Sequence, residues 1–222
     1  MSAENWVERA RSMYDRAIFG GDTSVLEDAD RELDAVEADL ALARGRVIHA
    51  RLMDRHGAAT QDAKDLAGTE ELALFERAAD LYRKLGDVRG EAESLFWIGV
   101  CHQVVREDGD AALPALERSH TLAAEAGDKL TSSYALRHLG YAEHMAGRLD
   151  TARERLEEST RLRRELGFLP GVAANLVGLA YVAAGQDRRQ DALALIEEAG
   201  TIAEASGARG IMRQVEEART NV

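Results

Sequence analysis

The residues best suited to chemistry in this sequence are six histidines and one cysteine, but their spacing does not assemble a site. The histidines are His49, His56, His102, His120, His138 and His144. A zinc-peptidase helix needs two histidines four residues apart with a carboxylate between them, and no pair here has that spacing. Cys101 is the single cysteine, and no activating base or oxyanion-binding group can be assigned to it. We therefore expect no catalytic residue, no metal ion and no cofactor, and a protein that is not an enzyme.

Glycine runs and neighbouring carboxylates are the remaining candidates, and helix packing explains both. The runs GVAANLVG and GLAYVAAG lack the spacing of a phosphate-binding loop and are typical of helices with small residues at packing points. The pairs Glu157-Glu158 and Glu197-Glu198 fall on predicted outward helix faces with arginine nearby, which indicates solubilising surfaces. Neither pattern predicts an active site.

The composition indicates an acidic, helix-rich protein. Its 222 residues carry a formal net charge of −12, and 45% of them are hydrophobic. Because phosphate binding needs clustered Lys and Arg, this charge argues against a nucleic-acid partner. No apolar run approaches the ~18 residues of a membrane span, so we expect no membrane partner. A single cysteine is typical of a reducing compartment, and we expect a cytoplasmic location.

A short phrase ending in glycine recurs four times and sets the period of the chain. The phrases LYRKLGD, LAAEAGD, LRRELGF and IAEASGA place their glycines 41, 40 and 40 residues apart, at Gly86, Gly127, Gly167 and Gly207. Eight residues before each glycine stands a small residue, namely Ala78, Ser119, Ser159 and Ala199. Three residues earlier stands a large apolar one, namely Phe75, Leu116, Leu156 and Ile196. Such a period predicts a stack of similar helical hairpins.

The repeat is clearest at residues 132–167, where two amphipathic helices near 131–146 and 151–166 are joined by a tight turn. Leu139-Gly140 in the first helix and Ala152, Leu156 and Ser159 in the second combine small and large residues at helical spacing. This pattern resembles the tetratricopeptide repeat. The period of about 40, compared with the family's usual 34, resembles arrays in bacterial signalling ATPases and peptide-pheromone regulators. No phosphate-binding loop or DNA-binding segment accompanies the repeats here.

The resemblance implies one all-α domain, residues 1–222, built as a right-handed α-solenoid of about five antiparallel helix pairs with a C-terminal closing helix. We expect Ser24 and Glu27 to cap a helix that ends near residue 37. We expect Trp6 and Tyr14 to cover the open end of the array. The predicted parts are a degenerate N-terminal hairpin at 1–38, a repeat at 39–87 with a loop insertion at 57–68, repeats at 88–128, 129–168 and 169–207, and a closing helix and tail at 208–222.

In this family the first helix of each hairpin lines a concave groove, so the resemblance also implies which side chains face a partner. Helical spacing places them on one stripe in each of the last three hairpins, and Val104 and Met145 belong to the same stripes. The implied contact residues are Phe96, Val100, Gln103, Tyr134, Arg137, Tyr141, His144 and Asn175.

The mixed aromatic, aliphatic and polar character of this groove suits an extended peptide, a partner's helix or a small amphipathic molecule. We predict a non-enzymatic adaptor that binds a protein or peptide. The alternative is a regulatory sensor that binds a small molecule or signalling peptide and acts on a separate regulator. The groove could instead pack against a terminal helix or a second copy of the chain in a homodimer. For an enzyme of unusual kind on this scaffold, the sequence supplies no set of catalytic residues.

Overall fold

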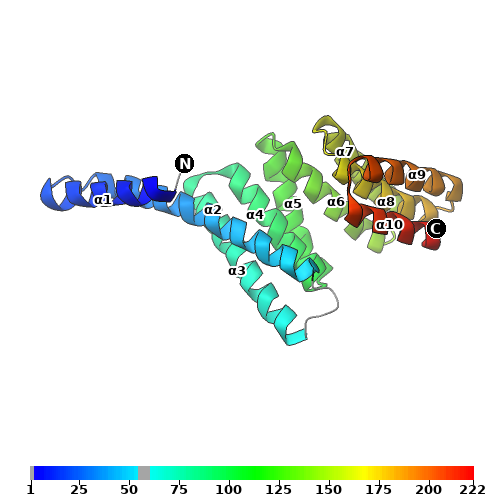
Figure 1. Ribbon diagram of the computed structural model, residues 1–222, viewed down its shortest axis with the longest axis horizontal. Helices are drawn as coiled ribbons and strands as arrows, with labels where there is room; N and C mark the ends of the chain where they lie inside the picture. Colours follow the sequence, from blue (N-terminus) through cyan, green and yellow to red (C-terminus); the bar gives the residue numbers. More distant parts are fainter. Residues whose placement is uncertain (1–2, 55–60) are drawn as a thin grey trace. The chain divides into compact units, whose positions relative to one another are not determined.

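The computed structural model describes residues 3–54 and 61–222, and in these two stretches the chain forms helices and turns and no strand (Figure 1). The all-α architecture that the sequence predicted is confirmed. The chain divides into two compact units, Met1–Trp97 and Ile98–Val222.

The first unit contains α1 (Ala3–Phe19), α2 (Val25–Asp54), α3 (Gln61–Leu85) and most of α4 (Val88–Val100). The expected helix break near residue 37 is wrong, because α2 continues through it for 30 residues. No glycine or proline interrupts α2 before Gly45, and alanine and leucine sustain the helix. The expected loop at 57–68 is also too long, because α3 begins at Gln61. Its residues 57–60 lie outside the described part of the chain.

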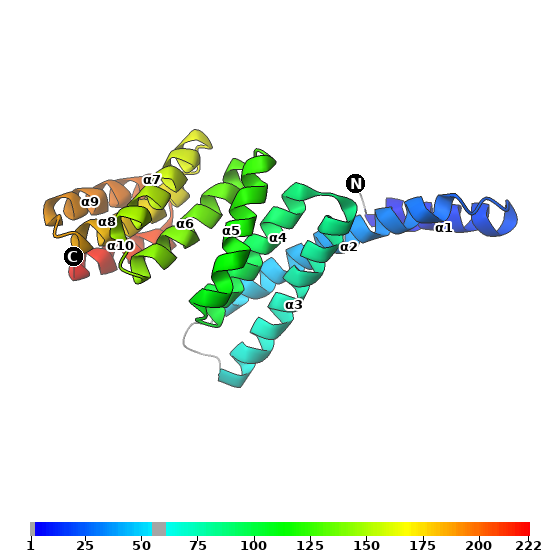
Figure 2. The ribbon, with the colours of Figure 1, turned by 180° about the vertical axis from the view of Figure 1, so that it is seen from behind.

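The core of the first unit lies between α2 and α3, which Figure 2 shows side by side from behind. Gly45 of α2 allows this close approach, because a Cβ on it would lie 2.5 Å from the ring of Phe75. Phe75 is fully buried and stacks on Trp97 of α4, with ring centroids 5.5 Å apart. The large residue of the repeat thus fills the space that a small residue leaves open.

The second unit stacks three helical hairpins and a closing helix. Its elements after α4 are η1 (Cys101–Val105), a single π-helical turn, followed by α5 (Gly109–Glu125), α6 (Lys129–Met145), α7 (Leu149–Glu165), α8 (Leu169–Gly185), α9 (Arg189–Ala205) and α10 (Arg209–Asn221). Helix α8 lies at the centre, since its apolar side chains join those of α7, α9 and α10 in one buried cluster. Helices α6 and α7 form one hairpin, α8 and α9 form the next, and α10 follows them.

The repeat positions serve the packing that their spacing predicted. The small residues Ala78, Ser119, Ser159 and Ala199 are fully buried, and so, within 3%, are the large residues Phe75, Leu116, Leu156 and Ile196. Each of the four repeat glycines adopts a left-handed conformation after its helix. At Gly127, for example, φ is 64° and the following amide of Asp128 donates to the carbonyl of Ala123 at 2.8 Å. Glycine is favoured at such a helix end because a side chain would be strained there.

Candidate binding site

A pocket of about 350 Å³ opens in the second unit, where side chains from η1, α6, α7 and α8 converge. Leu156 and Gly178 supply its apolar floor, while aromatic and polar groups surround them. The residues that line it are Gln103, Val104, Arg137, His138, Tyr141, His144, Met145, Leu156, Gly178 and Tyr181. We call this site the pocket.

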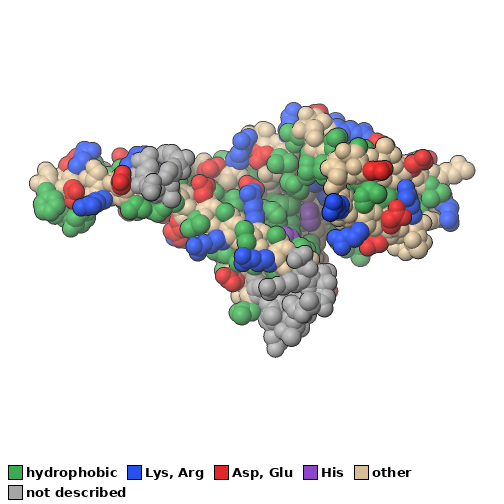
Figure 3. All heavy atoms as spheres, viewed as in Figure 1, with side chains coloured by type: hydrophobic (Ala, Val, Ile, Leu, Met, Phe, Trp, Pro, Cys, Tyr) green, Lys and Arg blue, Asp and Glu red, His purple; other side chains and the backbone are tan. Residues whose placement is uncertain are grey.

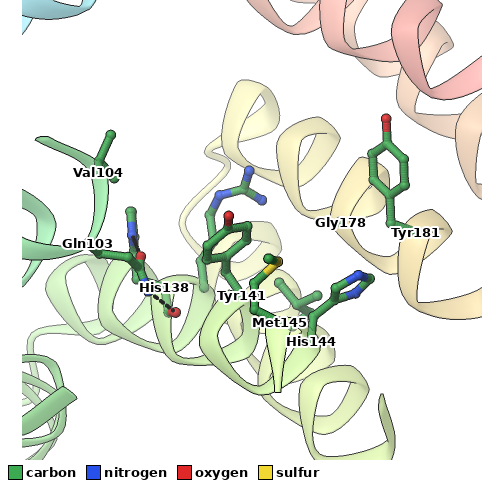
Figure 4. A pocket seen from close by; sticks show the side chains of 10 residues that line it. Gln103, Val104, His138, Tyr141, His144, Met145, Gly178 and Tyr181 are labelled. Atoms are coloured by element: carbon green, nitrogen blue, oxygen red, sulfur yellow. Dashed lines mark hydrogen bonds between the residues drawn. The ribbon is translucent and has the colours of Figure 1, made fainter. Parts of the chain in front are cut away.

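Helix α6 supplies half of the lining residues, most of them from a single face. Arg137, Tyr141, His144 and Met145 lie three or four residues apart or adjacent, which aligns them along the helix. Figure 4 shows Tyr141, Met145 and His144 side by side on α6, with Tyr181 of α8 across the opening. Tyr141 and Met145 are 53% and 67% exposed, so large apolar groups remain available at the rim.

The π-helical turn η1 brings Gln103 to the pocket and joins it to α6. The side-chain amide nitrogen of Gln103 donates to the backbone carbonyl of His138 at 3.1 Å. Its amide oxygen therefore faces Nδ1 of His138, 2.6 Å away, and accepts the proton carried there (Figure 4). These two bonds fix the orientation of the His138 ring on the pocket wall. π-Helical turns are frequent at functional sites.

Arg137 lies at the inner side of the pocket without a carboxylate partner among the described residues. One of its terminal nitrogens donates to the carbonyl of Ala174 at 2.7 Å and to Oδ1 of Asn175 at 3.1 Å. Because burial disfavours the charged form, the pKa of Arg137 is lowered to about 10. A cation held only by neutral acceptors can still favour an anionic or carbonyl group of a ligand.

Behind Arg137, a second arginine completes a buried polar network. Arg163 is only 2% exposed, and it donates to Oδ1 of Asn175 at 3.0 Å and to the carbonyl of Gly171 at 2.8 Å. Its guanidinium lies 5.0 Å from the ring centroid of Tyr134, a cation–π contact. Burial, with the nearby charge of Arg137, lowers the pKa of Arg163 to about 9. One terminal nitrogen of Arg163 has no hydrogen-bond partner among the described residues.

The eight residues implied by the resemblance separate into two groups. Gln103, Arg137, Tyr141 and His144 line the pocket together. The side chains of Phe96, Val100 and Asn175 are buried, and Tyr134 packs against Phe168 and Arg163. These four residues support the fold and do not line the pocket. Helical spacing alone could not separate the groups, because the depth of a side chain depends on its neighbours on other helices.

Sequence reasoning did not assign His138, Leu156, Gly178 or Tyr181 to the site. His138 directly follows Arg137 on α6, and it lies on the pocket wall in contact with Gln103 of η1. Leu156 packs in the hairpin core as its spacing predicts, but its side chain also forms the pocket floor. Gly178 leaves space at that floor, since a Cβ on it would lie 3.4 Å from Leu156. No sequence signal marks these four residues as lining one cavity.

No three His, Cys, Asp or Glu residues in 3–54 and 61–222 come together in a way that could hold a metal ion. Within the same stretches, every helix is too short or too polar to cross a membrane.

Comparison with known proteins rests on structure. No family model and no curated protein matches the sequence. BtubC (BKLC) from P. vanneervenii is a similar structure, with a TM-score of 0.54, 16% identity and coverage of 93% of both chains. A putative kinesin light chain from Podosopora anserina with nearly identical TPR-like repeats has a TM-score of 0.53 and 16% identity, over 81% of this chain and 97% of that one. A variant form of the same kinesin light chain matches with the same TM-score at 15% identity, over 81% of this chain and 94% of that one.

At these identities the likeness shows the fold. The hairpin period, the buried small and large residues and the similar structures agree with one another. The chain has the fold of the tetratricopeptide-like helical repeat proteins.

Proposed function

We propose that the chain is a non-enzymatic module that binds a protein or peptide through the pocket and the exposed side chains beside it on α6. The observation that carries this proposal is the pair Tyr141 and Met145, two large side chains left more than half exposed at the rim of a pocket. Tyrosine and methionine are enriched at protein interfaces, where they bury much area and adapt to a partner. They surround a few polar groups that can orient a ligand.

The polar groups indicate what the bound segment carries. Arg137 offers a guanidinium with no carboxylate partner in the described residues, so an acidic or carbonyl group of the ligand fits beside it. The rim of Tyr141, Met145 and Tyr181 fits an apolar side chain. We therefore propose that the partner contributes an apolar side chain next to an acidic or backbone carbonyl group.

Selection from a random peptide display library tests this function. Wild-type protein serves as the bait, and each enriched peptide is then measured against the variant Tyr141→Ala/Met145→Ala. Both side chains are exposed, so this variant keeps its fold, as circular dichroism can check. The control is Leu193→Ala, which removes a leucine that is 44% exposed on α9 and outside the pocket.

We expect peptides that bind wild type and Leu193→Ala equally and lose at least about tenfold in affinity for the pocket variant, since two interface anchors are removed. Peptides that bind all three proteins alike would contradict the proposal. So would a selection that enriches nothing.

The alternative, a sensor for a small molecule, is supported by the volume of the pocket. About 350 Å³ lies within the range of small-molecule sites. A thermal-shift screen of small amphipathic carboxylates distinguishes this function from the first. A saturable rise in melting temperature that Tyr141→Ala/Met145→Ala removes would favour the sensor, and the absence of any rise favours the peptide module.

In either case, the single buried Cys101 and the net charge of −12 support a cytoplasmic protein without a nucleic-acid partner.

A further inference from the structure

Helix α2 is apolar on two opposite faces, and the described residues cover only one of them. One face packs on α3 through Ala38, Leu42 and Gly45. The opposite face carries Leu26, Leu33, Leu40 and Val47, which are between 38% and 50% exposed. In Figure 1, α2 lies in front of α3, and Figure 3 shows hydrophobic side chains among charged ones over this part of the first unit. An apolar stripe on a helix is normally covered by another element.

The exposed face has the seven-residue period of a helix-pairing seam. Leu26, Leu33, Leu40 and Val47 follow one another at steps of seven. Three residues after each stands a second apolar residue, namely Ala29, Val36, Ala43 and Ala50. This is the a/d pattern of a coiled coil over four heptads, about 36 Å of helix. We call these eight residues the α2 seam.

The chain's own N-terminal helix does not cover the α2 seam. Helix α1 packs along the first part of α2, where Arg9 forms an ion pair with Glu32. It leaves Leu26 and Leu33 exposed and carries exposed apolar residues of its own at Val7 and Ile18. The sequence predicted Tyr14 as a cover for the open end, but this side chain is 56% exposed. An apolar surface therefore remains on the α1–α2 hairpin.

A row of charges beside the α2 seam identifies what covers it. Four residues after each exposed apolar residue stands a charged one, in the order Asp30, Glu37, Arg44 and Arg51. The first two residues of the row are acidic and the last two are basic. Among the described residues, Asp30, Arg44 and Arg51 have no ion-pair partner, while Glu37 accepts two hydrogen bonds from Arg77. Such a row is complementary to itself when it is turned end for end.

We propose that α2 pairs with α2 of a second copy of the chain, antiparallel, through the α2 seam. In the register that the charges select, Asp30 faces Arg51 of the second copy, and Glu37 faces Arg44 of the second copy. A parallel, in-register pair would instead set Glu37 against Glu32 of the second copy and Arg51 against its Arg46, and these like charges repel. An isologous antiparallel pair also closes with two-fold symmetry.

The same register matches the sizes of the side chains in the α2 seam. Leu33 faces Ala50 of the second copy, Leu40 faces its Ala43, and Val36 faces its Val47. Each large residue thus meets a small or medium one, which lets the two helices approach closely and interdigitate. Charge and size select the register independently, and they agree. This dimer uses the first unit, so its failure and that of the pocket function are distinguishable.

The oligomeric state of charge variants tests the pairing. Sedimentation equilibrium is measured for wild type, Asp30→Arg, Arg51→Asp and the double variant Asp30→Arg/Arg51→Asp. We expect a wild-type dimer, dissociation constants raised about tenfold for each single variant because two symmetric ion pairs become repulsive, and recovery in the double variant. A monomeric wild type would overturn the proposal, and so would a double variant as weak as the two single ones.

A substitution in the seam itself provides a matched comparison. Leu40→Glu places a charge in the centre of the α2 seam, whereas Leu193→Glu does so at a leucine of similar exposure on α9. We expect the first to be a folded monomer by circular dichroism and sedimentation and the second to remain a dimer. A Leu40→Glu variant that still dimerises would show that the interface lies elsewhere.

Disulfide cross-linking fixes the direction of the helices. Val36→Cys and Val47→Cys chains are prepared separately with tags of different size, mixed and oxidised, and wild type is the blank because its Cys101 is buried. In the proposed register the two new cysteines meet, so only the mixture should yield a cross-linked dimer. In a parallel pair these positions are about 16 Å apart, too far for a disulfide, and each variant would cross-link with itself instead. Self-cross-linking, or none, would refute the antiparallel seam.

Discussion

Asn175 is the residue that makes two buried arginines tolerable in the second unit. Its Oδ1 accepts from Arg137 at 3.1 Å and from Arg163 at 3.0 Å, and its Nδ2 donates to the hydroxyl of Ser159 at 2.8 Å. Ser159 in turn donates to the carbonyl of Ser133 at 2.6 Å. No carboxylate balances the two guanidinium groups within the described residues. The side chain of Asn175 therefore has a structural role beneath the pocket.

Replacing Asn175 separates the effects of shape and charge. Asn175→Ala removes the acceptor that the two arginines share and leaves Arg137 with the carbonyl of Ala174 and Arg163 with that of Gly171, so it should lower the free energy of unfolding by about 2 kcal/mol or more. Asn175→Asp supplies a carboxylate between Arg137 and Arg163, so it should lose distinctly less than the alanine variant although it gives up the donor to Ser159. Urea denaturation measures both. An aspartate variant no more stable than the alanine variant would contradict the role assigned to these arginines.

His120 gives the stability of the fold a dependence on pH. Its Nδ1 lies 3.0 Å from the hydroxyl of Ser132. Burial, followed by the charge of Arg155, lowers the pKa of His120 below its ordinary value of 6.5, while Glu158 opposes this shift. As the pH falls, His120 is therefore protonated in the unfolded chain before it is protonated in the folded chain. The contribution of His120 is fully present above pH 6.5 and is lost as the pH falls toward the lowered folded-state pKa.

We expect His120→Gln to remove this part of the pH dependence. Glutamine keeps a polar group near Ser132 but does not titrate. Urea denaturation at pH about 7.5 and about 5.5 should therefore show a smaller loss of stability on acidification in the variant than in wild type. An equal loss in both proteins would mean that His120 is protonated equally well in the folded and unfolded states.

At the scale of elements, each hairpin depends on the fit between one small and one large residue. In the hairpin of the third repeat, a Cβ on Gly99 would lie 2.6 Å from the side chain of Leu116, which is fully buried on α5. Gly99→Ala should therefore destabilise the protein by about 1–3 kcal/mol through overpacking. Leu116→Ala should cost about 2–5 kcal/mol through the cavity it leaves.

The double variant Gly99→Ala/Leu116→Ala tests whether these costs share one contact. The methyl group added at residue 99 enters the space vacated at residue 116, so the double variant should be more stable than the sum of the single losses predicts. Urea denaturation of all four proteins gives the coupling. Strict additivity would show that Gly99 and Leu116 are not packing partners.

Hairpin positions were predictable from the sequence because the information is local. Glycine at Gly127 or Gly167 ends a helix wherever it occurs with this spacing, and Leu156 and Ser159 share a helical face by their separation alone. The continuity of α2 was not predictable by the same means, since hairpin periodicity suggested a break that the helix-forming residues themselves did not require. The observed α2 follows the helix propensity of its own residues, and the break near residue 37 that the repeat pattern suggested is wrong.

At the scale of the molecule, the sequence could indicate which side chains face the groove but not how deeply each of them is buried. Arg137, Tyr141 and His144 follow from helical spacing on α6, yet the burial of Asn175 depends on Arg163, which belongs to another helix. The π-helical turn at η1 has no recognisable sequence pattern. The polar network of Arg137, Arg163 and Asn175 has none either, because its residues come from three different helices. The two proposed interfaces fall in different units, the α2 seam in the first and the pocket in the second, so solution measurements can test each without the other.

The measurement that tests the pocket function most directly is the NMR spectrum of the methionine methyl groups during titration with a peptide selected by display. The chain has five methionines, so the spectrum is simple, and Met145 lies at the pocket rim. Met145→Leu assigns its signal. We expect the Met145 methyl resonance to shift with a saturable dependence on peptide, while Met13 and Met53 of the first unit stay in place. A bound peptide that moves those two signals and leaves Met145 unchanged would contradict a binding site in the pocket.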